Sequence, residues 1–256
     1  MTAVLHELSG DGVLLLRINR PEAKNALNQD VRQQLAMHFL DATGNSAVKV
    51  IVMTGSQEVF VAGADIKAMA AASPIELLLR QNQTYWDAIA HCPKPVIAAV
   101  NGYALGGGCE LAMHADIIIA GENATFGQPE VRVGIMPGAG GTQRLARAVG
   151  KFKAMLICMT GQTFTGREAA EMGLASKAVP DAEVLETALQ TARTIAAMPP
   201  IAIRQIKEVM LAGADAPLET ALMLERKAFQ MLFDSEDQKE GMQAFLEKRK
   251  PVYRGV

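Results

Sequence analysis

Short β-rich apolar runs alternate with helical patterns along the chain before residue 180. We expect buried strands at four of these runs: Val13–Asn19, Val48–Thr54, Val96–Val100 and Ile117–Ala120. Between them, Gln29–Thr43 repeats apolar residues at helical spacing, and a second helix is predicted over Pro74–His91. This alternation predicts an α/β core of parallel strands joined by crossovers.

After about residue 180 the sequence shows only helical patterns and no further strand. Segments 181–197, 201–213, 218–233 and 235–249 have Ala-, Leu- and Glu-rich helical patterns. Pro199-Pro200 and the stretch from Ala214 to Pro217 mark breaks between them. A helical tail on an α/β core often packs against a neighbouring subunit. We therefore predict a core domain over 1–195 that carries the functional site, and a C-terminal oligomerisation region over 196–256.

Composition and charge narrow the function classes. The 256 residues carry 25 Lys plus Arg against 27 Asp plus Glu, and a net charge of −2 argues against binding to nucleic acid or to a membrane surface. Three cysteines and four histidines lack metal-ligand or CxxC spacing, so we expect neither a metal site nor a disulfide framework. The N-terminus lacks the pattern of a signal peptide. We expect a soluble, cytoplasmic protein.

Three glycine-bearing loops are candidates for a binding site: Phe60–Asp65, Asn101–Glu110 and Gly134–Arg144. None of them ends in the Gly-Lys-Ser/Thr of a phosphate-binding Walker A loop. The third loop fails the GxGxxG dinucleotide pattern, because Gln143 stands at the last glycine position. Nucleotide binding through a Walker A loop or a GxGxxG loop is therefore not expected.

The second loop places glycines 106, 107 and 108 at the start of a predicted helix that ends near His114. Glycines there let a ligand approach the backbone, and the free N–H groups of the first helical turn suit a developing oxyanion or a phosphate. Glu110 lies in that turn and Glu130 in a later loop. Each acid alone also fits a first-turn acid or a solvated loop acid. Together they would suit proton transfer next to a carbonyl.

At these residues the sequence resembles the crotonase superfamily, and specifically its enoyl-CoA hydratases. The resemblance covers nearly the whole chain and is carried by Asn101–Lys151, NRPEAKNALN from Asn19, FVAGADIKAM from Phe60, MTGQ from Met159 and FLEKRKP from Phe245. It implies an α/β spiral of ββα repeats followed by a C-terminal helical trimerisation region. It also implies a homotrimer or homohexamer, an acyl-CoA thioester substrate, and no cofactor beyond the coenzyme A of that substrate.

The resemblance also implies roles for individual residues. The backbone N–H groups of Ala62 and Gly107 would form an oxyanion hole for the thioester oxygen. Glu110 and Glu130 would hold one water between them, with Glu110 activating the water and Glu130 supplying a proton to the α carbon; the N–H of Gly138 would contact that water. The expected contacts with CoA are Lys24 near its phosphates, a tunnel at Ala62, Gly63, Ala64, Asp65 and Ile66, and Phe245 and Lys248 reaching the adenine end from a neighbouring helix or subunit.

The resulting hypothesis is an enzyme, a hydro-lyase, that adds water syn across the double bond of a trans-2-enoyl-CoA to give the 3-hydroxyacyl-CoA in fatty-acid β-oxidation or phenylacetate catabolism. An isomerase of the same fold, or a non-catalytic relative that binds CoA or RNA, are the alternatives. GIMPGAGGTQRL from Gly134 resembles 2,3-dehydroadipyl-CoA hydratases in particular. A residue for a distal carboxylate cannot be singled out from the sequence. His114 and Cys109 are interpreted as packing residues.

Overall fold

The computed structural model describes residues 2–256 and contains a large and a small β-sheet. The large sheet has the strand order β1-β2-β3-β5-β7-β10, in which only the β1–β2 pair is antiparallel. Its strands are β1 (Val4–Leu8), β2 (Val13–Ile18), β3 (Val50–Thr54), β5 (Val96–Val100), β7 (Ile117–Gly121) and β10 (Lys177–Val179). The predicted parallel α/β core is confirmed.

The small sheet supplies the second strand of each repeat. Its order is β4-β6-β8-β9, parallel except for the antiparallel β8–β9 pair. These strands are β4 (Val59–Val61), β6 (Tyr103–Leu105), β8 (Thr125–Gly127) and β9 (Thr163–Thr165). Because β4, β6 and β8 directly follow β3, β5 and β7 along the chain, the repeating unit is two strands and then helical structure. The predicted spiral of ββα repeats is therefore the observed fold.

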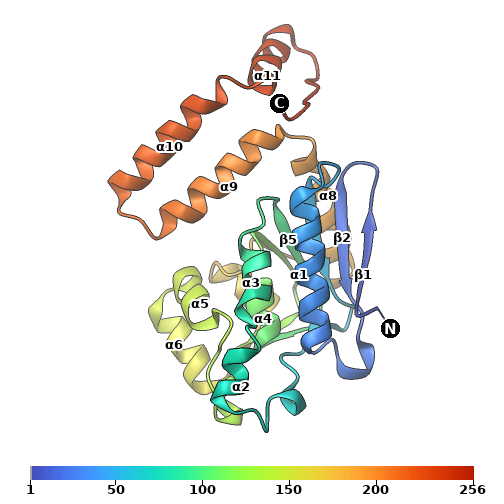
Figure 1. Ribbon diagram of the computed structural model, residues 1–256, viewed down its shortest axis with the longest axis vertical. Coiled ribbons are helices and arrows are strands. Elements are labelled where there is room, and N and C mark those ends of the chain that lie inside the picture. Colours follow the sequence, from blue (N-terminus) through green and yellow to red (C-terminus); the bar gives the residue numbers. More distant parts are fainter. Residues whose placement is uncertain (1) are drawn as a thin grey trace.

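The helices cover both faces of the large sheet (Figure 1). Those of the core are α1 (Gln29–Gly44), α2 (Pro74–Leu79), α3 (Gln83–Ala90), α4 (Gly107–Ala112), α5 (Gly141–Val149), α6 (Lys151–Thr160), α7 (Gly166–Glu171) and α8 (Val184–Ala196). Short 3-10 turns are η1 (Pro21–Ala23), η2 (Ile66–Ala68), η3 (Pro129–Val133) and η4 (Asp181–Glu183).

Alternate residues of the central strands build two hydrophobic cores, as the two-residue period of a strand requires. Ile51 and Met53 of β3 join the larger core, which α1, α3 and α4 cover, whereas Val50 and Val52 face α8. A row of small residues on α8 lets that helix lie close to the sheet: Val184, Ala188, Ala192 and Ala196. The predicted domain limit at 195/196 falls at the end of this helix.

The C-terminal region consists of α9 (Pro200–Ala214), α10 (Leu218–Leu232) and α11 (Glu236–Glu247). Figure 1 shows α9 and α10 side by side, projecting from the core. Large apolar side chains on this helix pair are exposed in the single chain, including Met210, Leu218, Met223, Phe229 and Met231. Exposed apolar surface of this extent is typical of an interface with another protein chain.

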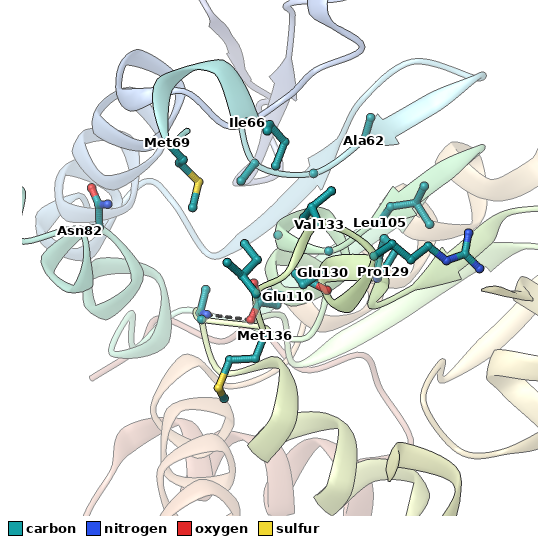
Figure 2. Close-up of a pocket in the computed structure, with 18 of the residues that line it drawn as sticks. Ala62, Ile66, Met69, Asn82, Leu105, Glu110, Pro129, Glu130, Val133 and Met136 are labelled. Carbon is teal, nitrogen blue, oxygen red and sulfur yellow. Dashed lines mark hydrogen bonds between the residues drawn. The ribbon is translucent and has the colours of Figure 1, made fainter. Parts of the chain in front are cut away.

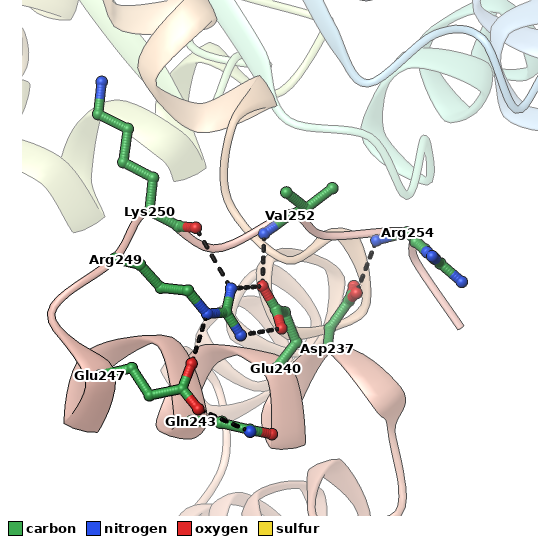
Figure 3. A network of polar contacts seen from close by, with 8 residues as sticks. All are labelled: Asp237, Glu240, Gln243, Glu247, Arg249, Lys250, Val252 and Arg254. Atoms are coloured by element: carbon green, nitrogen blue, oxygen red, sulfur yellow. Dashed lines mark hydrogen bonds and ion pairs between the residues drawn. The ribbon is translucent and has the colours of Figure 1, made fainter.

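Polar contacts fix the last residues of the chain to α11 (Figure 3). Arg249 forms two parallel hydrogen bonds to the Glu240 carboxylate, at 2.7 and 2.8 Å. Asp237 is almost fully buried and accepts hydrogen bonds from the backbone N–H groups of Arg254 and Gly255, at 2.7 and 2.8 Å. The chain terminus is thereby bound to the start of α11.

Two expectations for secondary structure were incomplete. The helix predicted over Pro74–His91 is two helices, because Gln81 takes a left-handed conformation (φ 46°) between α2 and α3. The strands β1, β4, β6, β8, β9 and β10 were not predicted. Most of them span only three residues, too few to show a two-residue period in the sequence.

Candidate active site

A cavity of about 430 Å³ opens between η2, the α2–α3 segment and the loop that contains η3. Its lining is mainly apolar and includes Ile66, Met69, Trp86, Leu105 and Met136. Figure 2 shows Glu110 and Glu130 near the middle of the cavity, with Met69 and Asn82 on one side of them and Ala62 and Leu105 on the other. The two predicted acids, far apart in sequence, therefore face one cavity.

Glu110 is held by the backbone at the start of another helix. Its side chain comes from α4 and is 3 % exposed, and Oε1 accepts hydrogen bonds from Ala139 N at 2.7 Å and Gly141 N at 2.8 Å. Gly141 is the first residue of α5, so the carboxylate lies at the positive end of that helix dipole. Burial raises the pKa of Glu110, and the two N–H donors oppose that shift.

Glu130 lies in the first turn of η3, and burial raises its pKa to about 7. The fully buried amide of Gln128 donates to both Glu130 oxygens, at 3.0 and 3.1 Å, when its nitrogen faces them. Gly106 makes room for this carboxylate: a Cβ there would lie 2.9 Å from Glu130 Oε1, and its φ of 51° disfavours other residues. A carboxyl group with a pKa near 7 exchanges protons readily at neutral pH.

The structure corrects one half of the predicted oxyanion hole. The N–H of Ala62 donates to the carbonyl oxygen of Lys24 at 3.1 Å and is therefore already satisfied. The N–H of Ala64 has no acceptor among the described residues, and its nitrogen lies 3.5 Å from the position a Cβ on Gly107 would take. The two free N–H donors are therefore those of Ala64 and Gly107. The first lies two residues after the predicted Ala62, and the second is the predicted residue.

The start of α4 is fixed by close packing. A Cβ on Gly108 would lie 2.1 Å from the Val61 carbonyl oxygen, so only glycine lets the helix approach β4 this closely. Gly107 is the first residue of α4, and its N–H therefore has no acceptor within the helix. This contact places the free N–H of Gly107 beside the loop that carries Ala64.

The other predicted tunnel residues divide into two groups. Gly63, Ala64 and Ile66 line the cavity, and so do Ala62 and Gly138. Asp65 does not line it: its carboxylate forms an ion pair with Arg20 at 2.9 Å, which fixes the loop. Lys24 lies outside the lining, next to the loop, with its carbonyl on Ala62.

Phe245 and Lys248 lie on and just after α11, outside the cavity lining of their own chain. Phe245 is 84 % exposed, and Lys248 ends the helix in a left-handed conformation. Their predicted contact with the adenine end of CoA, from a neighbouring helix or subunit, stays a prediction.

His114 and Cys109 lie beside the acids, in settings that suit packing. The Nδ1 of His114 is 2.8 Å from the Glu110 carbonyl oxygen, and the ring stacks on Trp86. Burial lowers the pKa of His114 to about 4 and raises that of Cys109 to about 12, so both stay neutral at pH 7.

Three features of this site were not predicted from the sequence. They are the Gln128 amide, the N–H donors of Ala139 and Gly141, and Arg32, which lines the cavity from α1. Gln128 stands two residues before Glu130, which was the only signal available for it.

Among residues 2–256, no group of His, Cys, Asp or Glu side chains is arranged to hold a metal ion. In the same range, no helix has the length and apolar character needed to cross a membrane.

Comparison with known proteins places this cavity in a family. The family described as Enoyl-CoA hydratase/isomerase matches residues 9–256. The chain is 44% identical to a 2,3-dehydroadipyl-CoA hydratase of Escherichia coli over 95% of both chains. It is 45% identical to a probable enoyl-CoA hydratase of Rhizobium meliloti over 94% of this chain and 93% of that one.

Solved structures agree with the sequence relatives. An enoyl-CoA hydratase of Bacillus anthracis, 35% identical, superposes with a TM-score of 0.95 over 99% of this chain and 100% of the other. A Geobacillus kaustophilus structure described as enoyl-CoA hydratase subunit I is 42% identical. It superposes with a TM-score of 0.93 over 99% of this chain and 98% of the other. With an α/β spiral, a cavity lined by two carboxyl groups and relatives of this similarity, the chain belongs to the enoyl-CoA hydratase/isomerase family.

Proposed function

We propose that this protein adds water syn across the double bond of a trans-2-enoyl-CoA and releases the 3-hydroxyacyl-CoA. The observation that carries the proposal is the meeting of Glu110 and Glu130 in one cavity beside the free N–H groups of Ala64 and Gly107. Two acids can divide the two proton transfers that hydration requires, and two fixed donors stabilise the charge that develops on the thioester oxygen.

In the proposed reaction, the N–H groups of Ala64 and Gly107 bind the thioester oxygen, and one water lies between the two acids. Glu110, whose ionised form the N–H groups of Ala139 and Gly141 stabilise, takes a proton from this water while the oxygen bonds to the β carbon. The electrons of the double bond move toward the thioester oxygen, and the protonated Glu130 then supplies a proton to the α carbon. Proton exchange between the acids through water restores the starting state. Because the acids share one water, the pair titrates as a unit.

The same donors would serve an isomerase, which moves a double bond and needs one acid to carry the proton. Hydration is favoured because Glu110 and Glu130 both line the cavity and burial raises the pKa of each. The test is the loss of ultraviolet absorbance of crotonyl-CoA, followed by identification of 3-hydroxybutyryl-CoA. A protein that shifts the double bond of a 3-enoyl-CoA but leaves crotonyl-CoA unchanged would contradict the proposal.

The proposed setting is fatty-acid β-oxidation or phenylacetate catabolism, in the cytoplasm, with coenzyme A entering only as part of the substrate. A homotrimer or a homohexamer would cover the exposed apolar side chains of α9 and α10. It would also bring Phe245 and Lys248 of one subunit toward the CoA site of the next. Sedimentation equilibrium tests the assembly: a monomer at micromolar concentration would contradict it.

A further inference from the structure

Arg32 is a partly buried arginine whose Nε lacks a hydrogen-bond partner. It lies on α1 and lines the cavity. Its Nε is the one buried side-chain nitrogen or oxygen without a hydrogen-bond partner in the part of the chain that the structure describes. Arginine remains protonated in proteins, and leaving a buried donor without a partner is costly. Native proteins satisfy nearly all such groups, so a ligand is the natural partner to look for.

The nearby carboxylates form hydrogen bonds or ion pairs with other groups. Glu110 and Asp65 act on Arg32 through their charge, but Glu110 Oε1 accepts from backbone N–H groups and Asp65 is paired with Arg20. The Nε of Arg32 therefore remains a donor that an anion entering this part of the cavity can reach.

Arg32 lies on the side of the cavity formed by α1 and α3. These two helices pack together, and Gln33 on α1 donates to the Tyr85 hydroxyl on α3 at 3.1 Å. Asn82 and Trp86, from the same segment, line the cavity, and Figure 2 shows Asn82 on the opposite side of the acids from Ala62. An acyl chain with its thioester at Ala64 and Gly107 extends past the acids toward this side.

We propose that Arg32 binds a carboxylate at the distal end of the acyl chain, so that the preferred substrates are enoyl-CoA monothioesters of dicarboxylic acids. This proposal rests on the proposed hydratase function and specifies its substrate class. The planar guanidinium matches a carboxylate through two parallel hydrogen bonds, which a methyl-terminated chain cannot form. The surrounding apolar wall holds the methylene groups and excludes water, which strengthens the pair.

Two other roles for Arg32 give different results. If Arg32 bound the phosphates of CoA, its loss would weaken every acyl-CoA equally. If it acted only on the charge of Glu110, its loss would change kcat and the pH profile for every substrate equally. Only contact with the distal carboxylate makes the effect depend on the end of the acyl chain.

The experiment compares carboxylated enoyl-CoAs of increasing chain length with methyl-terminated thioesters of the same lengths, using the full chain, Arg32→Met, Arg32→Lys and Arg204→Met. Arg204 lies on α9 and is exposed, so its variant removes the same charge away from the cavity. At the best chain length, Arg32→Met is expected to lower kcat/KM for the carboxylated substrate on the order of 10²-fold more than for the methyl-terminated substrate of the same length. Arg32→Lys should retain part of the preference.

A binding measurement makes the test independent of the variants. Calorimetry on the unmodified protein should show that saturated carboxylated acyl-CoA binds more tightly than its methyl-terminated counterpart, and that the difference shrinks at high salt. Methionine is close to arginine in length and removes a buried donor that has no partner, so Arg32→Met should remain folded. Equal loss for both substrate types, or no preference of the wild type at any length, overturns the assignment. Absence of hydration with all substrates instead contradicts the proposed function itself.

Discussion

The N–H of Gly141 donates to Glu110 Oε1 at 2.8 Å, and this bond connects the helix that carries one acid to the start of the next helix of the spiral. A Cβ on residue 141 would lie 2.8 Å from that same oxygen, so a side chain there would displace the carboxylate. Glu110 is thus fixed by the backbone, whereas Glu130 is held by the Gln128 amide. The two acids differ in their surroundings, and this difference separates their proton affinities.

The raised pKa of Glu130 predicts a pH-dependent cost to stability. Its carboxyl group has a pKa of about 7 when folded, above the ordinary value of 4.5, because burial disfavours the charged form. The unfolded chain therefore loses this proton first as pH rises, which destabilises the folded state between pH 4.5 and about 7. Glu130→Gln should raise Tm at pH 8 but leave it unchanged near pH 4. Equal Tm values for both proteins at pH 8 would show that Glu130 is not so shifted.

The same pKa predicts the alkaline side of the rate profile. Hydration requires one acid ionised and the other protonated, so kcat/KM should fall above pH 7, where Glu130 loses its proton. It should fall again at low pH, when Glu110 is protonated. Stopped-flow measurements with crotonyl-pantetheine, which lacks the ionising phosphates of CoA, separate the protein groups from the substrate. A flat profile from neutral to alkaline pH would be inconsistent with this assignment.

The corrected oxyanion hole can be tested with proline, which removes a backbone N–H. Ala64→Pro should lower kcat by about 10²–10³-fold, because it deletes a donor that serves only the substrate. Ala62→Pro should instead lower the free energy of unfolding, since the Ala62 N–H is bonded to Lys24. Urea unfolding and steady-state kinetics on both variants distinguish the two effects. Ala64→Ser serves as the control that keeps the N–H. If Ala64→Pro had wild-type kcat, the hole would lie elsewhere.

The buried Asp237 should stabilise the chain terminus. Asp237→Ala leaves the N–H groups of Arg254 and Gly255 without their acceptor and should cost about 1–3 kcal/mol of local stability. Hydrogen exchange at residues 254 and 255 should accelerate, while Glu236→Ala, an exposed acid of the same helical turn, should not change it. Similar exchange rates in the two variants would contradict this role.

Much of the core follows from local pattern. Val96–Val100 is a strand with the predicted bounds, because a fully buried strand is an uninterrupted apolar run. Helix α1 begins at Gln29 as predicted, behind the Asn28 side chain that accepts from Val31 N. Helices α8 to α11 lie within a few residues of their predicted ranges. The break at Gln81 was not predictable in this way, since no Gly or Pro marks it.

The site depends on contacts between distant residues, and there local pattern is insufficient. The free N–H belongs to Ala64 and not to Ala62, because the Lys24 carbonyl, remote in sequence, takes the other one. The role of Arg32 was also missed, since an arginine at a helical position is by default a solvated residue. Only packing of α1 against α3 places it in the cavity.

The most direct test of the two-acid account is the hydration of crotonyl-CoA by the wild type, Glu110→Gln and Glu130→Gln, measured as loss of thioester absorbance. Each variant removes one proton-transfer group and retains nearly the same side-chain volume, so each should lower kcat by about 10²–10⁴-fold. Binding of a saturated acyl-CoA should be unchanged, which shows that the cavity is intact. Rapid hydration by either variant, with bound acyl-CoA and an unchanged fold, would contradict the conclusion that the two carboxyl groups together carry the reaction.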